Sequence, residues 1–110
     1  MDRRVETILE EFINNEIAAT DQRIAAIHTF VETLRAELAA HAARVPEDAA
    51  DKKYIMMVLK LFKEMIQTYD EEVIVLTTKR SKMLDHLLSA RSVTTYLNPN
   101  TEQQNNLHIN

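Results

Sequence analysis

Two long heptad patterns, separated by one proline, constrain this 110-residue chain more than any other feature. In each pattern, mostly apolar residues alternate in steps of four and three, which places them on one stripe of an α-helix. We call each stripe a seam. The first seam comprises Ile13, Ile17, Thr20, Ile24, Ile27, Val31, Leu34, Leu38, His41 and Val45. The second comprises Ile55, Leu59, Phe62, Ile66, Tyr69, Val73, Leu76, Arg80, Met83, Leu87, Ala90, Thr94 and Leu97.

Proline residues predict where the helices end. The residue before a proline is pushed out of the α region, so Pro46 ends a first helix predicted at about 3–45. A second helix is predicted at about 48–97, where Asn98-Pro99 stops it. Its first turn is predicted to hold the negative charge that helix N-termini favour, from Glu47, Asp48 and Asp51. The polar residues 98–110 predict a disordered tail.

The short link between two helices of similar length predicts an all-α, coiled-coil-like hairpin of two antiparallel helices over residues 1–97. An apex near residue 50 sets the register, in which Val45 faces Ile55, Leu38 faces Phe62, Val31 faces Tyr69 and Ile17 faces Met83. The competing arrangement is one continuous helix through Pro46, which proline disfavours by about 3 kcal/mol.

Two regions depart from the simple seam. Thr20 and Arg80 fall in one polar layer, where Glu16 is expected to pair with Arg80 and the layer to fix register and partner choice. The alternative is an Arg80 side chain that extends to solvent. Upstream of Ile13, four apolar residues are expected to belong to the same broad buried face with a shifted phase: Val5, Ile8, Leu9 and Phe12.

Many apolar residues of the second helix lie outside its seam, which indicates an interaction surface. The expected interface comprises Met56, Val58, Leu61, Met65, Ile74, Leu84 and Leu88. We expect two hairpins to dimerise through it into a four-helix bundle. The alternative occupant is a helix of a different protein, because methionines suit adaptable binding surfaces.

The composition excludes several classes of function. The chain has no glycine and no cysteine, so it lacks P-loops, Rossmann turns, nucleophile elbows and thiolate sites. Its net charge of −4 disfavours nucleic-acid binding, and no apolar run reaches the ~20 residues of a membrane span. We therefore expect a protein that inserts in no membrane and is cytoplasmic, or is exported by a route that needs no cleavable signal.

Charge is distributed unevenly between the helices. Residues 1–45 carry five basic and eight acidic groups, whereas residues 51–97 carry eight basic and six acidic groups. Helices of opposite net charge are suited to lying side by side.

The histidines do not indicate a catalytic or metal site. His28 and Glu32, like Glu37 and His41, are four residues apart, but no second pair is expected to converge on either. Glu-x-x-His repeats of di-iron bundles are absent. We expect no enzyme activity, cofactor or metal, and keep a metal-binding or phosphotransfer helical bundle as the alternative of another class.

In outline, residues 1–97 are similar to the small helical-hairpin export chaperones of flagellar and type III secretion systems, which are also short, acidic and all-α. The likeness rests on no motif and therefore implies no site residues. The sequence predicts a non-catalytic protein–protein interaction module, a self-associating hairpin that binds or scaffolds partner proteins. The resemblance implies the alternative, a secretion chaperone that holds an amphipathic client helix.

Overall fold

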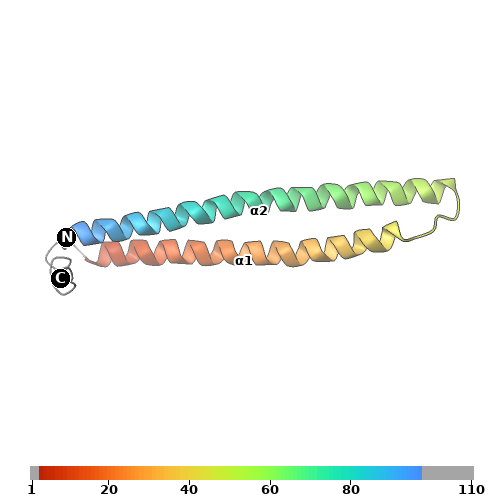
Figure 1. Ribbon diagram of the computed structural model, residues 1–110. Helices are drawn as coiled ribbons and strands as arrows, with labels where there is room; N and C mark the ends of the chain where they lie inside the picture. The colour runs from red at the N-terminus through yellow and green to blue at the C-terminus, as the bar shows by residue number, and fades with distance from the viewer. Residues whose placement is uncertain (1–2, 98–110) are drawn as a thin grey trace, which may run out of the picture. The chain divides into compact units, whose positions relative to one another are not determined.

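The computed structural model describes the backbone of residues 3–97 and the side chains of residues 4–92. Over these residues it has two helices, α1 (Arg3–Ala42) and α2 (Ala49–Leu97), which pack against each other as a hairpin (Figure 1). The predicted all-α hairpin is confirmed. The continuous helix through Pro46 is wrong, because Pro46 lies in the connection between the helices. The tail predicted at 98–110 lies outside the described residues.

The chain divides into two compact units, each built from a segment of both helices. Residues 22–77 form the first, which contains the connection and which we call the loop part. The second, which we call the terminal part, comprises residues 3–21 and 78–97 of the described chain. The heptad seams continue through both units, so each part has a core of its own.

The core of the loop part consists of large side chains. Ile27, Val31 and Leu34 of α1 and Ile66 of α2 are buried in one cluster. Partly buried apolar residues pack around them: Leu38, Phe62, Tyr69, Val73 and Leu76. All of these residues belong to the predicted seams, which explains why the two segments pack along this stripe.

The core of the terminal part is smaller. Ile13 and Ile17 of α1 pack against Leu87 and Ala90 of α2, with Met83 partly buried beside them. These residues also belong to the predicted seams. In both parts the clusters agree with the predicted register, because Val31 shares a cluster with Tyr69, and Ile17 with Met83.

The seam prediction fails at the end of α1. Val45 is 83% exposed and lies beyond Ala42, where the helix ends, whereas Ile55 is buried. The predicted Val45–Ile55 layer is therefore wrong. Helix α1 stops three residues earlier than expected because the chain is already turning toward the connection, where the amide of Arg44 donates to the carbonyl of His41 at 3.2 Å.

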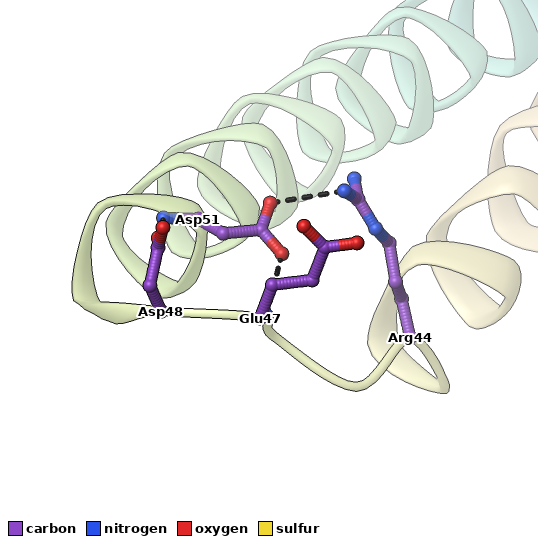
Figure 2. Close-up of polar contacts among 4 residues, drawn as sticks. All are labelled: Arg44, Glu47, Asp48 and Asp51. Carbon is purple, nitrogen blue, oxygen red and sulfur yellow. Dashed lines mark hydrogen bonds and ion pairs between the residues drawn. The ribbon is translucent and has the colours of Figure 1, made fainter.

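Acidic side chains fix the connection between the helices (Figure 2). Asp48 caps α2, since its Oδ1 accepts a hydrogen bond of 2.7 Å from the amide of Asp51. Asp51 in turn accepts from the amide of Glu47 and from the guanidinium of Arg44, both at 2.9 Å. This arrangement resembles a capping box. It allows a chain without glycine to reverse its direction, and no described residue adopts a positive φ.

The upstream apolar residues are not buried as predicted. Val5, Ile8, Leu9 and Phe12 are all about half exposed or more, and Phe12 reaches 63%. The reason is that the heptad spacing continues unchanged upstream of Ile13. Glu6 and Glu10 continue it backward from Ile13 and are half-buried, so the apolar residues fall beside the seam. Across residues 3–97, neither helix has an apolar stretch that could cross a lipid bilayer.

Candidate interaction surface

The loop part has one strongly apolar flank. An ion pair of 3.0 Å between Arg23 and Glu72 joins the helices along this side. Phe30 lies two turns after Arg23, and Met65 lies two turns before Glu72, so both belong to the same flank. Four α2 residues at spacings of four, three and four extend it toward the connection: Tyr54, Val58, Leu61 and Met65.

Most of this flank is accessible. Leu61 is 58% exposed, and Phe30 and Met65 are 41% exposed, whereas Val58 is half-buried. The ring of Phe30 contacts Tyr69 edge-on, with centroids 5.1 Å apart. The flank therefore presents several exposed apolar side chains beside the seam. Sequence reasoning missed Phe30 and Tyr54, although both fall on the stripe that borders the seam.

The remaining predicted interface residues of the loop part lie on its other flank. There, Arg35 pairs with Asp70 at 3.3 Å. Met56 lies four turns before Asp70, and Ile74 lies one turn after it. Ile74 lines a shallow depression with both partners of this ion pair. Leu61 and Met56, predicted to share one surface, thus lie on opposite sides of the loop part.

The terminal part also has two flanks, each marked by ion pairs between the helices. Lys79 pairs with Glu16 at 3.4 Å on one flank. On the other, Arg80 pairs with Asp21, and Arg91 lies 3.9 Å from Glu10. The two remaining predicted interface residues, Leu84 and Leu88, are exposed and belong to this second flank, because Leu84 lies one turn after Arg80 and two turns before Arg91.

The flank marked by the Glu16–Lys79 pair carries an apolar groove that the sequence did not predict. Its volume is about 460 Å³, and it is lined by Glu6, Leu9, Phe12, Ile13, Met83, His86, Ser89 and Ala90. Leu9 and Phe12 form one wall from α1, and His86 and Ser89 form the other from α2. Glu6 provides a carboxylate at one end. The sequence signal for this groove is that Glu6 and Glu10 occupy seam positions, so the large side chains of Leu9 and Phe12 fall beside the seam.

The predicted polar layer is present in modified form. Thr20 is buried, at 3% exposure, and donates to the carbonyl of Glu16 at 2.8 Å, so its own helix satisfies the hydroxyl. The predicted pair between Glu16 and Arg80 does not form. Arg80 donates from Nε to Asp21 at 2.6 Å, and its side chain is 40% exposed. Its long side chain thus leaves the seam for the surface, as in the alternative interpretation.

His41 contacts other parts of the hairpin, whereas His28 does not lie in the core. His41 stacks at a tilt on Phe62, with ring centroids 5.5 Å apart, and its Nδ1 lies 2.9 Å from the carbonyl of Glu37. His28 is exposed. Within the described part of the chain, no three His, Asp or Glu side chains form a group that could hold a metal ion.

Comparison with protein-family models, with curated proteins and with solved structures finds no match to this chain.

Proposed function

We propose that this chain is a non-catalytic protein–protein interaction module, a helical hairpin that associates with a second copy of itself and, in that form, binds or scaffolds other helical proteins. The observation that carries the proposal is the apolar flank of the loop part, formed by Phe30, Tyr54, Val58, Leu61 and Met65.

The energetics support burial of this flank. Complete burial of a leucine, methionine or phenylalanine side chain contributes about 1.5–3 kcal/mol. Leu61, Met65 and Phe30 each keep 41–58% of their surface exposed. A partner that covers them would therefore gain on the order of a few kcal/mol from these three side chains. Exposed apolar side chains gathered on one flank commonly mark an interface.

The geometry suits helices as the covering elements. The flank residues on α2 are spaced by four and three, so a helix laid along the flank can contact them on successive turns. Two further helices laid along it would complete a four-helix bundle. A second copy supplies such a pair of helices without any other component.

The second candidate is a secretion-type chaperone that holds an amphipathic client helix. The observation that favours it is the exposure of three methionines within three turns of α2: Met56, Met57 and Met65. Methionine side chains adapt to differently shaped partners, which is the property that a protein with several clients needs. The two candidates share Met65, whereas Met56 and Met57 lie outside the flank that carries the first candidate.

Leu61→Glu tests the proposal, because it places a charge in the centre of the flank. We expect helix content to stay at the wild-type value, since Leu61 is outside the seam, while the dissociation constant of the dimer rises at least about tenfold. Light scattering over a range of concentrations measures the mass, and circular dichroism measures the helix content.

Ala36→Glu is the matched control, because it adds the same charge to the exposed outer face of α1. It should leave the mass unchanged. A wild-type chain that is monomeric at every concentration would contradict self-association. A dimer that tolerates Leu61→Glu as well as the control would show that this flank is not the interface.

A further inference from the structure

Two short segments of this chain are complementary to each other in charge and similar in exposed apolar character. Residues 5–12, in α1 of the terminal part, contain three glutamates and no basic residue. Residues 52–63, in α2 of the loop part, contain four lysines and no acidic residue. The two segments would span about 12 and 18 Å along their helices, so their lengths are comparable.

Each segment presents large apolar side chains outward. In residues 5–12 these are Val5, Ile8, Leu9 and Phe12, with exposed fractions of 47–63%. In residues 52–63 they are Tyr54, Met56, Met57 and Leu61, with exposed fractions of 57–60%. Both segments therefore combine apolar surface with charge of one sign, and the signs are opposite.

The shapes of the two surfaces also correspond. Next to residues 5–12 lies the groove of about 460 Å³, with Glu6 at its edge and Leu9 and Phe12 in its wall. A space of this size accommodates methionine or tyrosine side chains. On the other segment, Lys52, Lys53, Met56, Met57 and Lys60 line one shallow depression on the outer face of α2, so the lysines border the methionines directly.

The seam sides of both segments are already occupied within the chain. Ile13, just after residues 5–12, packs against Leu87 and Ala90. Phe62, within residues 52–63, packs in the core cluster of the loop part. What remains for another molecule is the outer face of each segment together with the groove. On residues 5–12 these hold the exposed Glu11 and the groove-lining Glu6, and on residues 52–63 they hold the lysines.

We propose that the groove and acidic face of residues 5–12 in one copy receive the lysine- and methionine-bearing face of residues 52–63 in a second copy. The occupant is this chain itself, because it carries the matching surface for each of its own faces. Every copy has one segment of each kind and can therefore both donate and receive. This inference rests on the self-association proposed above and adds a second pair of contacting surfaces to the apolar flank of the loop part.

Charge exchange tests the pairing. Lys52→Glu/Lys53→Glu/Lys60→Glu leaves one lysine and three glutamates in residues 52–63, so both segments become acidic. Glu6→Lys/Glu11→Lys leaves two lysines and one glutamate in residues 5–12, so both segments become basic. In each variant alone, like charges would meet, so we expect the dissociation constant of self-association to rise at least about tenfold at ~50 mM salt. Mixed in equal amounts, the two variants should associate with each other at close to wild-type affinity.

Analytical ultracentrifugation at ~50 mM and ~500 mM salt measures the association, and circular dichroism confirms that each variant remains helical. The effect of the reversals should shrink at the higher salt concentration, where the Debye length falls to a few ångströms. Glu32→Lys/Glu47→Lys is the control for Glu6→Lys/Glu11→Lys, because it makes the same change of net charge outside both segments. It should associate like the wild type.

The outcomes separate this inference from the proposed function. A wild type that associates, together with variants that associate equally well or fail to recover on mixing, would overturn the pairing and leave self-association intact. A wild type that is monomeric at every concentration would contradict both the pairing and the self-association. Recovery on mixing, without recovery in either variant alone, supports the pairing of these two faces.

Discussion

The loop part and the terminal part use the same heptad register but fill it with different residues. In the loop part, the core cluster of the seam consists of isoleucine, valine, leucine, phenylalanine and tyrosine, and His41 is the one polar seam residue with a half-buried side chain. In the terminal part, they include Thr20, Ala90 and the half-buried Glu6, Glu10 and Arg80. A seam with small and charged residues buries less apolar area per layer, and burial is the main source of stability in a hairpin.

The two parts also differ in where their large side chains go. In the terminal part, Val5, Ile8, Leu9 and Phe12 stand outside the seam, on exposed surface. The loop part has both a full seam and an apolar flank. We therefore expect the seam to contribute more to stability in the loop part than in the terminal part.

The largest effect should come from a charge in the richer seam. Leu34→Asp places a carboxylate in the cluster of Ile27, Val31 and Ile66, where the side chain of Leu34 is only 5% exposed. We expect a loss of about 4 kcal/mol or more in the free energy of unfolding, enough to unfold a marginal hairpin. Circular dichroism with urea titration measures it.

The neighbouring exposed position provides the control for this substitution. Thr33→Asp adds the same charge one residue away, on the outer surface, and should cost about 1 kcal/mol or less. If the two variants unfold at the same urea concentration, the loop-part seam is not the main support of the hairpin.

Paired truncations compare the two cores directly. Ile27→Ala should cost about 3–4 kcal/mol, because the side chain is 1% exposed among large neighbours that leave a cavity. Leu87→Ala should cost about 2 kcal/mol, since Met83 beside it can partly fill the space. Urea denaturation of both variants, at one protein concentration, gives the two values. A larger loss for Leu87→Ala would reverse the ranking of the parts.

The smallest effect should come from repairing the terminal seam. Glu10→Leu replaces a half-buried carboxylate with a residue that fits the heptad. Its partner Arg91 lies 3.9 Å away and is 57% exposed, so the lost ion pair contributes little. We expect a gain of about 0.5–1 kcal/mol in stability. The exposed position next to it serves as the control, because Glu11→Leu should give no such gain; equal gains would mean that Glu10 is not on the seam.

Much of the fold follows from residue spacing. The register and the seam from Ile13 to His41 could be predicted, because each position alternates by four and three and no other stripe is as continuous. Val45 could not be placed, since it fits the spacing but follows the last turn of α1. The heptad spacing alone does not show where the break at Pro46 and the Asp48 cap of α2 interrupt the helical pattern.

The candidate surface could be predicted only as a set of residues. Leu61 and Met56 were recognised as outside the seam, but their assignment to opposite flanks requires knowing which ion pairs join the helices. Arg80 shows a related limit, because its flexible side chain reaches Asp21 while Glu16, predicted as its partner, pairs with the neighbouring Lys79. Residue spacing identifies the helix face on which a side chain lies, but it does not show which of two neighbouring long side chains forms a given ion pair.

The capped connection also determines the order in which contacts can form during folding. Arg44 and Asp51 are seven residues apart, whereas the pairs Arg35–Asp70, Arg23–Glu72 and Asp21–Arg80 span 35, 49 and 59 residues. The entropy lost on closing a loop grows with the number of residues it contains, and contacts of low sequence separation form fastest. Once the Asp48 cap and the Arg44–Asp51 pair have formed, each further layer closes only a few additional residues. The hairpin should therefore close as a zipper that starts at Asp48, and the terminal groove should be the last element to assemble and the first to open.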